Sequence, residues 1–186
     1  MIEVLVSILL ISIGLLGIAG LSGATFSYNK ASQIRLTGLA LVNDYADRAR
    51  VNVYGFDSGA YDISLSDDFQ STPATVPDAN LDRDPSNEVE ALAVASALAA
   101  VDIDQFLRTV RNRLPQGDAV VIGRPTATTR DLDVWLLWKE AKTDSGSADD
   151  DRGDFGLFDT AKQNCPGNLS AAEQEEYSCM YFKVGL

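Results

Sequence analysis

Residues 4–24 read VLVSILLISIGLLGIAGLSGA, and this stretch decides the fold of the first part of the chain. No charged residue occurs from Val4 to Asn29. A helix needs about 20 apolar residues to cross the hydrocarbon of a bilayer, so the run predicts a membrane-spanning helix. A cleavable secretory signal is the competing interpretation, but it would carry a basic n-region and a shorter apolar core.

A single carboxylate, Glu3, stands at the start of this apolar run. An unpaired carboxylate in hydrocarbon costs several kcal/mol, which indicates that Glu3 has a partner. No basic side chain precedes Lys30, so the chain itself offers only the α-amino group at Met1. Two interpretations remain: a second subunit supplies a cation, as in a self-assembling helical array, or Glu3 lies at the interface and is hydrated.

Four glycines also interrupt the apolar run at a spacing of three residues. Each costs roughly 1 kcal/mol of helix propensity relative to alanine in water. They indicate either close approach of neighbouring helices, as in small-xxx-small contacts, or only the tolerance of transmembrane helices for glycine. These glycines are Gly14, Gly17, Gly20 and Gly23.

The helical pattern continues beyond the apolar run. Small and apolar residues recur at spacings of three and four, which is typical of an amphipathic helix: Ala31, Ile34, Gly38, Leu41, Tyr45 and Ala49. No proline precedes Pro73, so one helix is predicted from about Ile2 to Asn52, about 76 Å long. We divide the chain into a transmembrane half of this helix (1–26), its amphipathic half (27–53) and a globular head (54–186).

The head is predicted to begin with a long irregular connection over residues 55–87, a candidate partner-binding region. Its Asp78, Asn80, Asp82 and Asp84 alternate like the start of a calcium loop, but a solvated acidic turn is the simpler interpretation. A second helix is predicted for about 87–114, capped by Ser86 and ended by Pro115-Gln116-Gly117. A break near Asp102-Ile103-Asp104 could divide it in two.

Beyond residue 117 the hydrophobic period changes to two, which predicts strands. The apolar residues occur in three segments: Ala119 to Gly123, Leu132 to Lys139, and Met180 to Val184. We expect an antiparallel sheet of three or four strands, with Trp135 and Trp138 on opposite faces of their strand. The predicted class is therefore α+β, a long N-terminal helix packed on a small antiparallel sheet.

Two cysteines, Cys165 and Cys179, lie near the end of the chain with 13 residues between them. They match no zinc spacing, because a tetrahedral site needs four ligands and the chain contains no histidine. A disulfide is the simpler interpretation, and it implies an oxidising compartment such as a periplasm or cell surface. Two reduced, buried thiols are the alternative.

The charge distribution also restricts the function. Residues 1–53 carry four basic and three acidic side chains, whereas residues 54–186 carry 11 basic and 24 acidic ones. Such a surface repels nucleic-acid phosphates, so no nucleic-acid partner is expected. The acidic tract Asp144 to Gly156 is interpreted as an exposed loop. Without histidine, a Gly-x-Ser-x-Gly motif or a phosphate-binding glycine loop, neither an enzyme nor a cofactor or metal site is predicted.

The stretches Ile2–Leu10 (IEVLVSILL) and Ile13–Leu21 (IGLLGIAGL) resemble the N-terminus of type IV pilins, especially the minor pilins called PilV or pilus modification proteins. Tyr45–Asn52 (YADRARVN) is similar to an Ala-Asp-Arg stretch that these proteins often carry. In the family, a prepilin peptidase cuts after a glycine and the new N-terminal phenylalanine is methylated. This sequence has Met1 where the family has leucine, and it lacks the preceding glycine, phenylalanine and threonine. Either the start is truncated, or processing differs.

The resemblance implies a pilin-like fold and a minor pilin that assembles with other minor pilins and the major pilin to prime or cap the type IV pilus, supporting its assembly or adhesion. Glu3 would neutralise the free amine of an adjacent subunit. The protein would be a single-pass inner-membrane protein with a periplasmic head, would meet the inner-membrane assembly machinery and then enter the pilus. The alternatives are a pseudopilin of a type II secretion system and a membrane-anchored binding or sensor domain.

Overall fold

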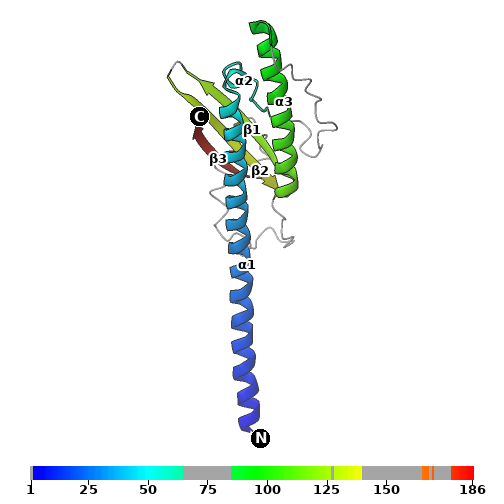
Figure 1. Ribbon diagram of the computed structural model, residues 1–186. Coiled ribbons are helices and arrows are strands. Elements are labelled where there is room, and N and C mark those ends of the chain that lie inside the picture. The colour runs from blue at the N-terminus through cyan, green and yellow to red at the C-terminus, as the bar shows by residue number, and fades with distance from the viewer. Residues whose placement is uncertain (1, 65–84, 127, 140–164, 168, 170–176) are drawn as a thin grey trace. The chain divides into compact units, whose positions relative to one another are not determined.

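The computed structural model describes residues 2–64, 85–126, 128–139, 165–167, 169 and 177–186, except for the side chains of residues 24, 27 and 31. The chain forms two compact units, residues 1–37 and 38–186. The elements, labelled in Figure 1, are α1 (Ile2–Val51), α2 (Val53–Asp57), α3 (Glu88–Arg113), β1 (Asp118–Pro125), β2 (Arg130–Lys139) and β3 (Tyr177–Gly185). The predicted α+β class is confirmed.

Helix α1 runs without a break for 50 residues and ends one residue before the predicted Asn52. Its outer part, from Gly38 onward, packs in the second unit through the predicted stripe, in which Leu41, Tyr45 and Ala49 are buried. Gly38 allows close contact with the sheet, since a Cβ there would lie 2.7 Å from Met180 Cε and 3.1 Å from Leu136 Cδ1.

The sheet has three antiparallel strands in the order β1-β2-β3. The register pairs Val121 with Val134 and Leu136 with Met180, so these side chains share the face that meets Gly38. Helices α1 and α3 lie on this side of the sheet (Figure 1). Tyr45 of α1 stacks on Phe106 of α3 with ring centroids 4.3 Å apart, which joins the two helices above the sheet.

Helix α3 differs from the prediction at two points. Its N-cap is Asn87, one residue after the predicted Ser86, because the Asn87 side chain accepts a hydrogen bond from Glu90 N at 3.0 Å. Ser86 instead donates its backbone N–H and its hydroxyl to the Glu90 carboxylate. The possible break near Asp102 does not occur, since α3 is continuous to Arg113.

The opposite face of the sheet has its own small core, with Val120, Leu137 and Tyr177 buried in it. Leu169 packs there, and Cys165 is joined to Cys179 by a disulfide, as the sequence predicted. The disulfide therefore attaches a segment outside the sheet to its last strand.

The connection after α1 is more ordered at its start than the sequence indicated. Asn52 caps the short helix α2, and Ile63 forms an isolated bridge with Val121 of β1. The calcium-like residues Asp78, Asn80, Asp82 and Asp84 lie outside the described residues, as does the acidic tract 144–156.

Candidate functional site

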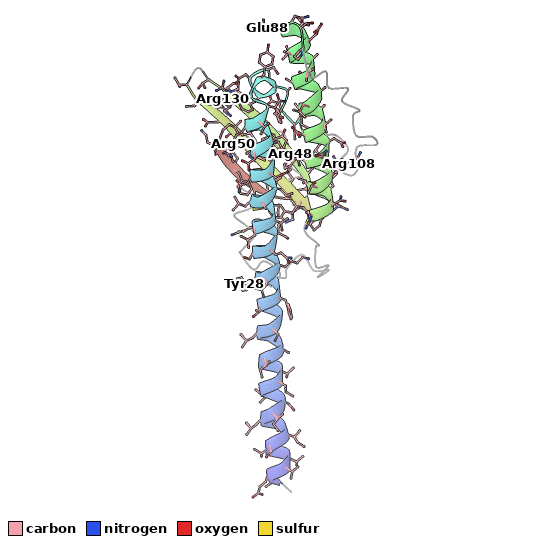
Figure 2. The ribbon with its side chains drawn as sticks, in the orientation of Figure 1. Tyr28, Arg48, Arg50, Glu88, Arg108 and Arg130 are labelled. Atoms are coloured by element: carbon pink, nitrogen blue, oxygen red, sulfur yellow. A yellow bond between two sulfur atoms is a disulfide. The ribbon has the colours of Figure 1, made fainter. Side chains whose placement is uncertain are left out.

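The first 37 residues contain Glu3 and the four glycines that the sequence singled out. Their large apolar side chains up to Phe26 are exposed, with Leu5 at 69%, Leu16 at 73% and Phe26 at 74% of full exposure. Figure 2 shows side chains projecting from all sides of this segment. This helix is long and apolar enough to cross a membrane, and none of its most apolar window is buried by the rest of the chain.

The hydroxyl groups within this apolar segment bond to the helix itself. Ser7 Oγ donates to the carbonyl oxygen of Glu3 at 2.8 Å, and Ser12 Oγ donates to that of Ile8 at 2.7 Å. Ser22 and Thr25 make the same bond to the residue four positions earlier. These bonds satisfy polar groups that an apolar environment could not. These four hydroxyl groups therefore need no hydrogen-bond partner from outside the helix, whereas the carboxylate of Glu3 does.

Glu3 lies exposed in the first turn of α1. No ion pair of its carboxylate occurs within the described part of the chain, and the α-amino group at Met1 lies outside it. A carboxylate near the helix N-terminus interacts favourably with the helix dipole, which is worth roughly 0.3–1 kcal/mol. That interaction is too weak to offset transfer into hydrocarbon. A cation from another molecule or interfacial water would have to do so.

The four predicted packing glycines are not explained by contacts within the chain. A Cβ added at Gly14, Gly17, Gly20 or Gly23 would meet no other atom within 4 Å. At 100° per residue, a spacing of three moves each glycine about 60° around the helix, so the four cover about half its circumference. This segment could thus admit a close neighbour over a broad face, or the glycines could be merely tolerated.

Side chains of the stretch Tyr45–Asn52 form hydrogen bonds with other residues of the head. Arg48 Nη1 donates to Asp102 Oδ1 at 3.2 Å and Nε donates to Asp44 Oδ2 at 3.0 Å, while Asn52 Nδ2 donates to the carbonyl oxygen of Ala95 at 2.7 Å. Arg48 is labelled beside α3 in Figure 2. The bonds to Asp102 and Ala95 connect the end of α1 and the following Asn52 to α3, so this stretch anchors the helix to the head.

Two buried tyrosines complete this anchor. Tyr45 donates its hydroxyl to the carbonyl oxygen of Tyr61 at 2.7 Å, and Tyr61 donates to Asp102 Oδ2 at 2.7 Å. Burial, and to a lesser degree the nearby Tyr61 and Asp102, raises the pKa of Tyr45 well above its ordinary value. Burial and the hydrogen bond to Asp102 also raise the pKa of Tyr61. Both hydroxyls therefore remain protonated donors and are unsuited to act as bases near neutral pH.

Sequence reasoning missed Asp102, which was treated as a possible helix breaker. It lies in the buried stripe of α3 with Ala95, Ala99, Phe106 and Val110. A carboxylate at a buried position of an otherwise apolar stripe is a signal that a basic or hydroxyl partner faces it. Here those partners are Arg48 and Tyr61.

The described residues were also compared with the requirements of a metal site. Within them, no group of three or more Asp, Glu or Cys side chains could hold a metal ion. The first 37 residues thus remain the candidate functional site. In comparisons with protein-family models, curated proteins and solved structures, nothing matched this chain.

Proposed function

We propose that this chain is a minor pilin of the type IV pilus, similar to the PilV or pilus modification proteins. In this proposal, residues 1–26 lie first in the inner membrane and then in the filament core, and the head lies in the periplasm and later on the pilus. The protein contributes to priming or capping the filament by assembly with other pilins. It does no catalysis.

One observation carries this proposal. A 50-residue helix is anchored at one end in an α+β head, while its apolar part buries no surface within its own chain and carries one carboxylate near its start. A simple membrane anchor needs the apolar surface but has no use for the carboxylate, because a charge lowers the stability of insertion. A helix that assembles with others can use it to set register against a neighbour's positive terminus.

In this proposal, the charge of Glu3 selects the offset at which a neighbouring helix packs against α1. In a surrounding of low dielectric constant, an unpaired carboxylate is costly and its pairing with an ammonium group is favourable. The pair forms only when two helices are offset so that one terminus reaches the other carboxylate. The adjoining glycines allow the backbones to approach closely in this arrangement.

The test is a Glu3→Gln variant expressed at its normal level in the native host, with the amount in sheared filaments measured against the amount in the membrane. We expect membrane insertion to remain and incorporation to fall at least tenfold, because about 1.4 kcal/mol in register energy already gives that factor. Ser7→Ala is the matched control, since it removes a polar group one turn away without changing the charge.

A monomeric, membrane-anchored binding domain predicts the opposite result. Its Glu3→Gln variant would function normally, and neither variant nor wild type would appear in sheared filaments. That outcome would contradict the pilin proposal.

A further inference from the structure

Two charged side chains enclose the apolar part of α1. Glu3 lies in the first turn, and Lys30 is the next charged residue along the chain. Helix α1 continues without a break between them, and both side chains are exposed. Among the described residues, no ion pair involves either of them. Their charges are therefore available to groups outside the chain.

The distance between these two charges matches the thickness of a lipid bilayer. At about 1.5 Å per residue, Glu3 and Lys30 lie about 40 Å apart along the helix axis. The hydrocarbon of a bilayer is about 30 Å thick, and the bilayer with its headgroup layers is about 40–45 Å thick. A helix tilted by about 20° still separates the two charges by about 38 Å along the bilayer normal. Both charges can therefore lie outside the hydrocarbon at the same time.

The aromatic residues near Lys30 fit the same placement. With the two charges at equal distances from the bilayer centre, that centre lies level with Leu16 and Gly17. Phe26 then lies about 14 Å from the centre, just inside the hydrocarbon, and Tyr28 lies about 17 Å from it, at the boundary with the headgroups. The side chains of Phe26 and Tyr28 are 74% and 50% exposed. Tyrosine is enriched at this depth of a bilayer, because its ring is apolar and its hydroxyl is polar.

The direction of side chains on a helix also favours this placement. Each Cα–Cβ bond of an α-helix is tilted toward the N-terminus. The short side chain of Glu3 is therefore directed away from the hydrocarbon, whereas Lys30 needs its long apolar stem to keep the ammonium group in the headgroup layer. In this position the carboxylate avoids the cost of transfer into hydrocarbon. It does not strengthen insertion, but it limits how deeply that end of the helix enters.

Lipid fits this segment better than other copies of the chain do. Residues 2–23 are all exposed, and a helix that is apolar all round needs cover on every side. A bilayer provides this cover and also accounts for the spacing of the two charges, which an assembly of helices in water leaves unexplained. We propose that a lipid bilayer covers residues 4–26 before assembly, with Glu3 in the headgroup layer of one leaflet and Lys30 in that of the other. This placement rests on the membrane location in the function proposed above, but not on filament assembly.

The test uses the full chain in vesicles of dioleoylphosphatidylcholine, with one nitroxide spin label on an introduced cysteine. The native cysteines do not react with the label, because they form a disulfide. Electron paramagnetic resonance then measures how often a water-soluble nickel complex collides with each label. We expect collisions at Ile2→Cys and Asn29→Cys to be at least about tenfold more frequent than at Leu16→Cys, because the polar complex is excluded from hydrocarbon.

A thicker bilayer tests whether the charge of Glu3 limits the depth of insertion. In dierucoylphosphatidylcholine, the Ile2→Cys label of the otherwise unchanged chain should stay accessible to the nickel complex, because the neighbouring Glu3 has to remain in the headgroup layer. Adding Glu3→Gln should lower the collision frequency at least about threefold, since the uncharged end can enter the thicker hydrocarbon. Ser7→Ala is the matched control and should change this frequency little.

Several results would overturn the proposal. Equal protection of the Ile2→Cys and Leu16→Cys labels would mean that Glu3 lies within the hydrocarbon. An unchanged collision frequency after Glu3→Gln in the thicker bilayer would mean that its charge does not limit the depth. Protection of the Leu16→Cys label that is lost when the protein is diluted in lipid would identify other copies as the cover. These three results leave filament assembly untouched, whereas full exposure of all the labels in vesicles would also contradict the membrane location in the proposed function.

Discussion

Residues 2–37 and residues 38–51 belong to one continuous helix but have opposite environments. In the first part, apolar residues occur around the whole circumference over residues 2–26, where the large apolar side chains are exposed, and Ile34 near its end is half-buried. In the second, polar residues occupy one side and a buried stripe containing Val42, Tyr45 and Ala46 occupies the other. The stability of each part therefore depends more on what packs against it than on helix propensity.

The outer part therefore packs against other residues of the same chain, whereas residues 2–23 of the inner part are exposed in the described structure. The stripe of the outer part was a sufficient signal, because a helix with one apolar side needs one surface to cover it. A helix that is apolar all round needs lipid or several neighbours. The following predictions are arranged by expected effect, and each compares the two parts.

The largest effect is expected for removal of a buried ring. Tyr45→Ala should lower the free energy of unfolding of the head by about 4 kcal/mol, because it leaves a cavity beside Phe106 and removes the bond to Tyr61. Urea unfolding of the full chain in detergent, followed by Trp fluorescence, measures this. Leu16→Ala in the inner part should change the result by less than about 0.5 kcal/mol. If Tyr45→Ala and Leu16→Ala lowered the free energy of unfolding by similar amounts, the proposed difference between the two parts of α1 would be wrong.

Loss of the disulfide should have the next largest effect. Replacing Cys165 and Cys179 with alanine should lower the stability of the head by about 3 kcal/mol, since the cross-link restricts the unfolded chain. Wild-type protein treated with reductant should give the same midpoint in urea. The inner part of α1 should keep its far-UV circular dichroism in micelles when the head unfolds, because the detergent covers it. Simultaneous loss of all helical signal would show that the two parts depend on each other.

Two carboxylates that bind the same guanidinium should differ in importance. Asp102→Ala should cost about 2 kcal/mol of head stability, since it leaves Tyr61 and Arg48 without a buried acceptor. Asp44→Ala should cost less than about 0.5 kcal/mol, because 59% of that side chain is exposed. The same urea measurement applies. Equal effects would mean that burial does not determine the strength of these pairs.

The smallest effects concern pH and should be confined to the head. Burial, opposed by hydrogen bonds from Ala119 and Arg111, raises the pKa of Asp118 above 3.8. The folded state therefore binds this proton more tightly, so the Asp118 contribution to stability falls as pH rises through its raised pKa. Asp118→Asn should remove that slope, which urea midpoints measured across this pH range would detect.

Asp133 should show the opposite sign. Although burial opposes its ionisation, hydrogen bonds from Tyr181 and Arg124 lower its pKa below 3.8. Its stabilisation is present above the unfolded value and is lost as pH falls through the lowered pKa, so Asp133→Asn should be most destabilising near neutral pH. Urea midpoints between pH 3 and 7 test both signs. Glu3→Gln in the other unit should leave this head profile unchanged.

Much of the fold was predictable because it follows local periodicity. The stripe through Leu41, Tyr45 and Ala49 indicated the buried side of α1, and alternation from Leu132 to Lys139 indicated β2. The helix over 87–114 was predicted, but the buried role of Asp102 was not, because its partners Arg48 and Tyr61 come from distant positions in the sequence. The short helix α2 and the bridge of Ile63 likewise depend on tertiary contacts.

For the candidate site, the sequence identified unusual residues but not what they contact. Glu3 was noticed because a charge is costly in an apolar run, and the glycines because they weaken a helix. Their use depends on molecules outside the chain.

The hydroxyl bonds of Ser7, Ser12, Ser22 and Thr25 have a consequence for movement. Each of these side chains has its acceptor one turn back on its own helix. When such a rod is withdrawn from one oily medium and inserted into another, those hydroxyls need not exchange partners on the way. In the proposed transfer from membrane to filament, Glu3 would then be the group whose charge has to be paired anew.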